Sequence, residues 1–221
     1  MVASSAKPSE TRTSPRSRWS PLSRWLASAV SSCVRVIEPA SISVSPSGAT
    51  PTGYIVYRDD GDSATPSIVV FEGDALTATA SGLTGGTSYS FMVAALSVAG
   101  VGDVSGVSAQ STSPAAPLGL SSVTQTSTSI SLSWSASVVG AGGSAVTSYK
   151  VYRNDGSSAT AALSSTAAHT TADGSTTTAT VSDLSAGLLY RFAVSAVSAA
   201  GEGDQSSILA QSYSPGANAS G

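Results

Sequence analysis

Side chains suited to catalysis or metal binding are scarce in this sequence. It contains one histidine, His169, and one cysteine, Cys33. A nucleophilic triad needs an activated serine, but no serine here lies in the strained Gly-x-Ser-x-Gly turn that presents one. A zinc site needs more thiol or imidazole ligands than Cys33 can gather. We therefore predict no catalytic, metal or cofactor site, with His169 in a solvated loop and Cys33 as a small, half-buried apolar residue or an intermolecular thiol.

Clustered acids and glycines offer two further candidate sites. Asp59, Asp60 and Asp62 surround Gly61, but the spacing and closing Glu of a calcium loop are absent, which favours a hairpin turn. The pattern Gly-x-Gly-Asp occurs twice, at 100–103 and 201–204. Its glycines predict a tight turn between the last two strands of a repeated unit.

Charge is low and unevenly distributed along the chain. Only 10% of the 221 residues are charged and 6% are aromatic. Residues 1–38 carry six basic and two acidic side chains, whereas the remainder carries four basic and eleven acidic ones. The folded part therefore lacks the basic face that nucleic acid requires. No apolar run reaches the 18 residues or more that a transmembrane helix needs, so we predict no transmembrane segment in this chain.

A pattern that occurs twice organises the chain. Leu83 precedes Tyr89 by six residues, and Leu184 precedes Tyr190 in the same way. After each Tyr, Phe, Val and Ala follow at steps of two, which predicts a strand with one buried face. The pairs Ile42 with Ile130, Tyr54 with Tyr149 and Tyr89 with Tyr190 differ in spacing, so the second unit is expected to have longer loops.

The alternating segments predict an all-β chain of two units. Residues 113–117, Ser-Pro-Ala-Ala-Pro, form a short, semi-stiff spacer between them. The predicted organisation is a disordered, targeting or misassembled segment at 1–32, a first domain at 33–113, a second at 114–214 and a disordered tail at 215–221. The expected strands are 33–37 (a short edge strand), 41–45, 53–58, 67–71, 75–81, 105–111, 118–124, 129–134, 147–153, 160–165, 176–181 and 206–213.

The second unit resembles the fibronectin type III domain along its whole length. The resemblance rests on Trp134 in the second strand, the Tyr-x-Val-Tyr motif that begins at Tyr149, the Leu184-to-Tyr190 spacing and the late glycine Gly201. It implies an immunoglobulin-like sandwich of seven strands in two antiparallel sheets. The implied core residues are Trp134, Tyr149, Leu184, Tyr190 and Phe192, with Tyr54, Leu83, Tyr89 and Phe91 in the first unit.

The first unit departs from this pattern in its N-terminal half. Pro46 stands where Trp134 aligns, so either Trp19 or Trp25 fills the space, or the unit is degenerate or wrongly joined at its start. The resemblance also implies that the Tyr hydroxyl bonds an upstream backbone group. Some relatives carry an integrin-binding Arg-Gly-Asp near the last turn, but Val101 and Glu202 replace the arginine here, so no integrin site is expected.

These features predict a non-enzymatic module that binds an unknown protein, or a carbohydrate, or acts as a spacer or adhesion module. The alternative is an accessory or linker portion of a larger extracellular enzyme or receptor. An autonomous hydrolase is a weaker hypothesis, because no catalytic spacing is present. Either of the first two functions suggests an extracellular or membrane-anchored protein.

Overall fold

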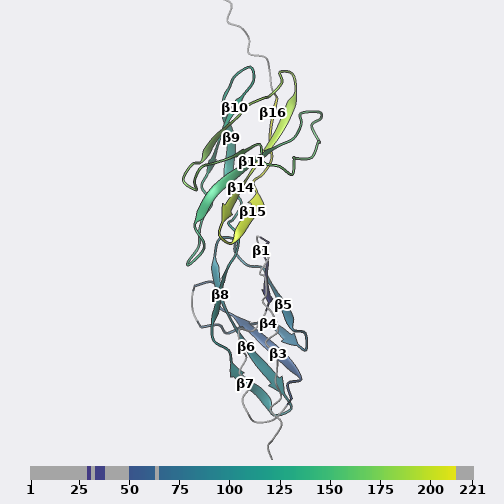
Figure 1. The fold of residues 1–221 in the computed structure, drawn as a ribbon, viewed down its shortest axis with the longest axis vertical. Helices are drawn as coiled ribbons and strands as arrows, with labels where there is room; N and C mark the ends of the chain where they lie inside the picture. Colours follow the sequence, from purple (N-terminus) through teal and green to yellow (C-terminus); the bar gives the residue numbers. More distant parts are fainter. Residues whose placement is uncertain (1–28, 31–32, 38–49, 63–64, 213–221) are drawn as a thin grey trace, which may run out of the picture.

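The chain folds into two β-sheet units arranged end to end (Figure 1). The computed structural model describes residues 29–30, 33–37, 50–62 and 65–212. Each unit pairs a three-stranded sheet with a five-stranded one, and every strand pair is antiparallel, which confirms the predicted all-β, immunoglobulin-like architecture. Several expectations lie outside the described residues: most of the segment 1–32, Trp19, Trp25, the strand 41–45, Pro46 and the tail 215–221.

The second unit is a sandwich of two sheets. Its smaller sheet has the order β13-β10-β9, from β9 (Leu118–Gln125), β10 (Ile130–Ser135) and β13 (Thr178–Val181). Its larger sheet has the order β12-β11-β14-β15, and β16 also pairs with β14. These strands are β11 (Val146–Arg153), β12 (His169–Thr170), β14 (Leu189–Ser198), β15 (Gly201–Gln205) and β16 (Leu209–Ser212).

The core of the second unit lies between these sheets and is built around aromatic rings. The rings of Trp134 and Tyr149 meet edge to face, with centroids 5.5 Å apart. The backbone N–H of Ser137 donates to the Tyr149 hydroxyl at 3.0 Å, so this buried phenol is paired. All five side chains that we expected in this core are at most 5% exposed: Trp134, Tyr149, Leu184, Tyr190 and Phe192.

Both units contain the same tyrosine corner. The Tyr190 hydroxyl accepts a hydrogen bond from the backbone N–H of Ser185 at 3.0 Å. The Tyr89 hydroxyl accepts the equivalent bond from Thr84 at 2.9 Å. The prediction that each Tyr bonds an upstream backbone group is therefore confirmed.

The first unit repeats the strand pairing of the second. Its smaller sheet has the order β1-β2-β5, from β1 (Ala29–Val30), β2 (Cys33–Ile37) and β5 (Thr77–Ser81). Its larger sheet has the order β4-β3-β6-β7, with β8 also pairing with β6. These strands are β3 (Gly53–Arg58), β4 (Ile68–Gly73), β6 (Ser88–Ser97), β7 (Gly100–Val104) and β8 (Ser108–Ser111).

Strand β2 corrects two expectations. It lies between β1 and β5 rather than at an edge. Val34 faces Ala80 in the same way that Ile130 faces Val181, so β2, and not 41–45, occupies the place of β10. The alignment of Ile42 with Ile130 is therefore wrong. By this register the sequence position that corresponds to Trp134 is Glu38, which lies outside the described residues, rather than Pro46.

Among the side chains that the structure describes, the first unit has the smaller buried cluster. Its buried cluster consists of Val56, Ala78, Ala80, Leu83, Tyr89 and Phe91. Tyr54, which we expected in this core, is half-buried and lies outside the cluster. Its counterpart Tyr149 packs against Trp134.

Two other segments differ from expectation. Residues 160–165 form turns and irregular structure, and the strand beside β11 is instead the short β12. The two Gly-x-Gly-Asp stretches begin strands β7 and β15 rather than forming the turns, which lie just before them at 98–99 and 199–200. Gly100 and Gly201 have φ of 116° and 121°, so each supplies the left-handed residue that ends a hairpin turn.

Candidate functional site

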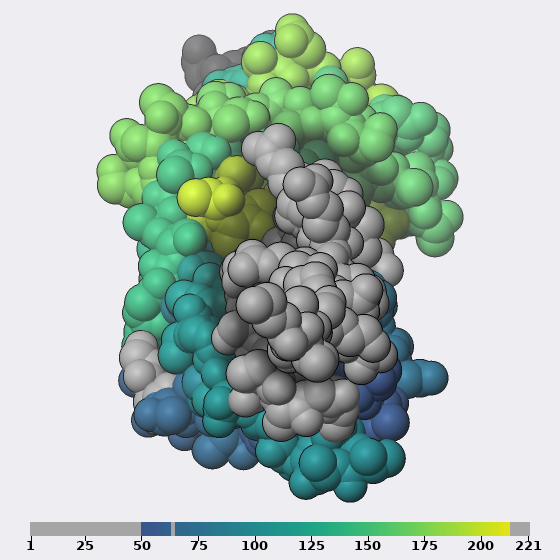
Figure 2. Space-filling model, turned by 60° about the horizontal axis from the view of Figure 1, so that its bottom comes forward, coloured from purple at the N-terminus to yellow at the C-terminus, as the bar shows by residue number. Residues whose placement is uncertain are grey.

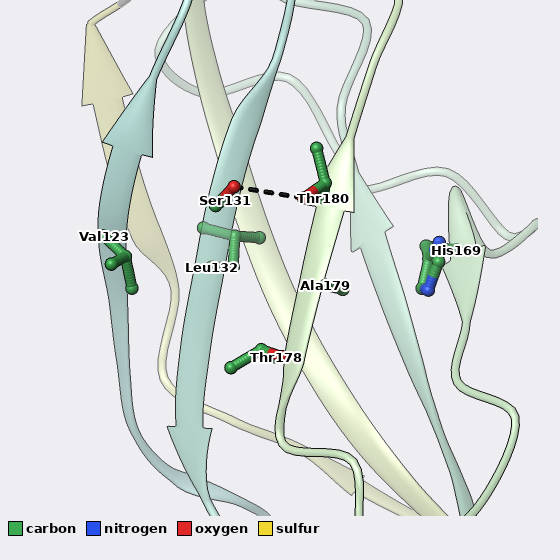
Figure 3. Close-up of a pocket in the computed structure, with 7 residues that line it drawn as sticks. All are labelled: Val123, Ser131, Leu132, His169, Thr178, Ala179 and Thr180. Carbon is green, nitrogen blue, oxygen red and sulfur yellow. Dashed lines mark hydrogen bonds between the residues drawn. The ribbon is translucent and has the colours of Figure 1, made fainter.

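A groove on the second unit is the first place where the structure could hold a ligand. Its volume is about 460 Å³. It is lined by Val123, Ser131, Leu132, His169, Thr178, Ala179 and Thr180 (Figure 3). The hydroxyls of Ser131 and Thr180 bond each other at 3.0 Å, and His169 stands apart from them on β12. His169 is thus half-buried in a strand, which corrects its expected place in a solvated loop.

The chemistry of this groove is limited to hydroxyls and one imidazole. None of its seven lining residues carries a carboxylate, so they provide no acid and base pair. Across the described ranges, no three His, Cys, Asp or Glu side chains gather closely enough to hold a metal ion. Within the same ranges, no helix is long and apolar enough to cross a membrane.

A polar network lies on the outer face of the larger sheet in the second unit. Glu202 on β15 accepts hydrogen bonds from Lys150 Nζ at 2.7 Å and from the Tyr152 hydroxyl at 2.6 Å. The Ser195 hydroxyl donates to the same carboxylate at 2.5 Å. Three strands are therefore tied together through one carboxylate: β11, β14 and β15.

The pKa shifts in this network favour the ionised forms of Glu202 and Lys150. Burial alone would raise the pKa of Glu202, but the bonds from Lys150, Ser195 and Tyr152 together hold that pKa below its ordinary value. The bond to Glu202 raises the pKa of Lys150, and burial followed by that same carboxylate raises the pKa of Tyr152. A carboxylate that accepts three hydrogen bonds and is kept ionised is suited to clamping strands rather than to proton transfer.

The junction between the units is the third candidate, and backbone groups build it. We define the junction as residues 84–88, 112–117 and 137–143. The N–H of Gly140 donates to the carbonyl of Gly86 at 2.9 Å, and the N–H of Ser88 donates to the carbonyl of Ala141 at 3.2 Å. A loop of the first unit is thereby bonded to the β10–β11 loop of the second. In Figure 2 the teal surface of the first unit continues into the green surface of the second.

The connecting segment is part of this junction rather than a free spacer. Ser113, Pro114 and Pro117 are almost fully buried, and Gly86 N–H donates to the Ser113 carbonyl at 2.7 Å. Just before them, the Thr112 hydroxyl donates to the Thr84 carbonyl at 2.8 Å. Pro114 and Pro117 thus do more than stiffen an exposed linker, which is the role that the sequence alone suggested.

Glycines allow the two loops to approach this closely. A β-carbon on Gly143 would overlap the carbonyl oxygen of Gly86, and one on Gly203 would overlap the carbonyl of Pro114. Our sequence-based predictions did not include this contact of residues 140–143 with the first unit. The available signal was a second pair of glycines, Gly85 and Gly86, in the loop that these residues meet.

The two antiparallel sheets, the Trp134–Tyr149 core and the tyrosine corner define residues 115–212 as an immunoglobulin-like β-sandwich. The sequence model of the fibronectin type III domain family matches these same residues. The chain therefore carries a fibronectin type III domain at 115–212.

Curated relatives are carbohydrate-degrading enzymes. Chitinase A1 of Niallia circulans is 39% identical over 160 residues, which cover 68% of this chain and 20% of that enzyme. Exoglucanase B of Cellulomonas fimi is 35% identical over 166 residues, which cover 70% of this chain and 13% of that enzyme. The chain thus spans a fifth or less of the length of these relatives. A two-domain fibronectin type III segment of chicken tenascin is 18% identical, with coverage of 85% and 96% and a TM-score of 0.41.

Proposed function

We propose that this chain is a non-catalytic spacer segment of a larger extracellular enzyme that degrades an insoluble polysaccharide. Its place in such an enzyme is supported by the two enzyme relatives, of which it matches only a small part. Both alignments are longer than the stretch 115–212, so the likeness extends beyond the fibronectin type III domain itself. Because insoluble polymers remain outside cells, this function implies an extracellular location.

The bonded junction is the observation that carries the spacer function. The ends of a flexible linker move relative to each other. Their root-mean-square separation grows with the square root of the linker length. Here the connecting Pro114 and Pro117 are buried, and backbone bonds at Gly140 and Ser88 join the two units directly. Such a segment holds whatever flanks it at one separation and orientation.

The absence of a carboxylate from the groove supports a non-catalytic function. Most glycoside hydrolases cleave with a pair of Asp or Glu side chains that flank the scissile bond. The groove offers Ser131, Thr180 and His169 instead. Adhesion through an Arg-Gly-Asp loop has no support either, because Val101 and Glu202 stand before the Gly-Asp pairs.

A sedimentation and turnover assay tests this proposal. The pure protein is incubated with chitin and with cellulose, then scored for co-sedimentation and for released sugars. We expect the protein to remain in the supernatant and to release nothing. Sugar release that is lost in His169→Ala would contradict the non-catalytic function, and specific co-sedimentation would replace the spacer with a substrate-binding module.

A further inference from the structure

The end of the second unit that lies away from the junction repeats the end of the first unit that forms it. Strand β14 begins where Leu189 pairs with Ser212 on β16, and β6 begins in the same way beside β8. Figure 1 shows β16 at the upper end of the second unit, with β15 beside the junction. We define the far loop as residues 184–188, which precede β14 as residues 83–87 precede β6.

The far loop follows the backbone path of its counterpart. Gly187 and Gly86 have φ of 83° and 71°, so the chain makes the same left-handed turn in both loops. Each loop also donates one backbone N–H to the hydroxyl of its tyrosine corner. The far loop therefore has the local geometry of a loop that already docks on another domain in this protein.

The two loops differ in what covers them. Gly86 and Thr87 are buried, and a β-carbon on Gly86 would lie 2.9 Å from the carbonyl oxygen of Val138 in the second unit. Gly187 is exposed, and a β-carbon built there would meet no atom of the described residues within 4 Å. The far loop therefore has space for the contact that its counterpart makes.

The repetition continues into the segment after the last strand. Ala-Gln-Ser-x-Ser-Pro occupies 109–114 and recurs at 210–215, with the same spacing that separates Gly86 from Gly187. Ala, Gln and Ser belong to β8 and β16, so strand pairing accounts for them. The Ser-Pro pair lies beyond both strands and needs another explanation.

At the junction the Ser-Pro pair connects the two units. The Ser113 carbonyl accepts a hydrogen bond from the N–H of Gly86 at 2.7 Å. Pro114 is buried, and a β-carbon on Gly203 of the second unit would overlap its carbonyl. Residues 214–215 lie outside the described part of the chain, but they repeat the residue types of this connector at the same sequence separation from the far loop.

We propose that the far loop docks on a further β-sandwich domain of the fibronectin type III family, which follows the second unit as the second follows the first. The inference rests on the proposed function, in which this chain is one segment of a larger protein. At the junction the Gly86 carbonyl accepts a hydrogen bond from the N–H of Gly140. The Gly187 carbonyl is the equivalent acceptor in the far loop.

The side chains of the far loop narrow the choice of partner. Leu188 takes the place of Thr87, and Gly140 lies so close to Thr87 that a β-carbon on it would come 2.5 Å from the threonine hydroxyl oxygen. Because leucine is longer than threonine, the partner must also carry a glycine opposite Leu188. The domain at 115–212 shows such a loop, since its β10–β11 loop contains Gly140 and Gly143.

An extended chain tests the proposal. Residues 1–215 are followed by a second copy of residues 115–221, so that the copy follows the repeated Ser-Pro pair. Spin labels are placed at Val123→Cys in the second unit and at the same residue of the copy, in a Cys33→Ser background; Val123 is 60% exposed. We expect one narrow distance distribution, because a docked copy is held in one orientation, whereas a flexible connector gives a broad distribution.

A substitution in the copy shows whether the far loop makes the contact. Gly143→Ala in the copy alone should broaden the distribution, because at the junction a β-carbon on Gly143 overlaps the Gly86 carbonyl. The matched control Gly106→Ala, where a β-carbon meets nothing within 4 Å, should leave the distribution narrow. A broad distribution in the extended wild type would overturn the proposal. So would a narrow distribution that Gly143→Ala in the copy leaves unchanged, since the contact would then not use this loop.

The docking and the proposed function can fail separately. The distances are measured without polysaccharide, whereas the spacer function is tested by sugar release and co-sedimentation of the 221-residue chain. Sugar release or co-sedimentation beside a narrow distribution would refute the proposed function and leave the docking in place. A broad distribution with neither sugar release nor co-sedimentation would refute the docking alone.

Discussion

The two units share the residues that bond the backbone and differ in the residues that fill space. Asp59 in the first unit and Asn154 in the second use the same oxygen twice, accepting from the glycine two residues later and from a strand across the sheet. In contrast, among the described side chains the second unit has the larger core cluster, and it carries the Lys150–Glu202 pair at the positions where the first unit has Ile55 and Val101.

This difference shows which features the repeated architecture requires. Turn residues and tyrosine corners give hydrogen-bond partners to backbone N–H groups that are buried or partly buried. Core volume and outer-face polarity can change as long as the strands still pair. The following predictions test that division, in order of decreasing effect.

Removal of a core aromatic side chain should lower the unfolding free energy most in the second unit. Trp134→Ala removes a 5% exposed indole that packs on Tyr149, and large-to-small changes of this kind cost about 3–5 kcal/mol. Tyr54→Ala in the first unit removes a half-buried ring outside the core cluster, so its cost should be smaller. Calorimetry of the whole chain measures both; a larger loss for Tyr54→Ala would reverse the ranking of the two cores.

A side chain at the junction should loosen the contact between units. In Gly143→Ala the new β-carbon meets the carbonyl of Gly86, so the loops must move apart, at a cost of about 1–3 kcal/mol. The matched control is Gly106→Ala, where no atom lies within 4 Å. Amide exchange should accelerate at Gly140 and Ser88 only in Gly143→Ala, and unchanged protection there would refute the bonded junction.

Loss of the Tyr hydroxyl should destabilise the two units equally, because the two tyrosine corners have the same geometry. Tyr190→Phe and Tyr89→Phe each leave a backbone N–H without its hydroxyl acceptor, on Ser185 and Thr84. An unpaired donor of this kind costs about 1–2 kcal/mol. Chemical unfolding of both variants checks this, and a clear effect in only one unit would mean that the two corners are not equivalent.

The Glu202 network should give the second unit an acid-dependent stability. Its bonds hold the pKa of Glu202 below the ordinary 4.5, so their stabilisation is present above pH 4.5 and is lost as pH falls through the lowered folded-state pKa. The raised pKa of Lys150 has the opposite effect on the pH dependence of stability. Its stabilisation is present below pH 10.5 and is lost as the pH rises through the raised folded-state pKa. Glu202→Gln should cost about 1 kcal/mol at neutral pH, since the pair is partly exposed.

Urea unfolding at neutral pH and in acid separates this effect from general acid denaturation. The wild type should lose more stability in acid than Glu202→Gln does. The control Glu72→Gln, on an exposed carboxylate of the first unit, should keep the wild-type slope. If the stabilities of the wild type and Glu202→Gln depend on pH in the same way, the network does not contribute to the stability of the second unit.

Sequence alone predicted what depends on local pattern. The strand alternation around Tyr190 follows from spacing within one segment, and the tyrosine corners follow from the resemblance to the fibronectin type III domain. The place of β2 could not be predicted reliably, because both 33–37 and 41–45 alternate and only pairing with β5 decides between them. The Gly-x-Gly-Asp stretches were assigned to turns, since glycine favours both turns and the bulges that follow them.

Contacts between segments far apart in sequence were not predictable from pattern. Pro114 and Pro117 read as a spacer, yet their burial depends on loops from both units. The Glu202 network needs three strands in register, and neither Lys150 nor Ser195 signals its partner in the sequence. Such contacts depend on the packed arrangement of the chain.

A distance measurement across the junction tests the fixed two-unit spacer most directly. Spin labels are placed at Leu76→Cys and Val123→Cys, which are 62% and 60% exposed, in a Cys33→Ser background. The bonded junction predicts one narrow distance distribution in the wild-type junction and a broad one after Gly143→Ala. A broad distribution without that substitution would show that the units move independently and would contradict the fixed spacer.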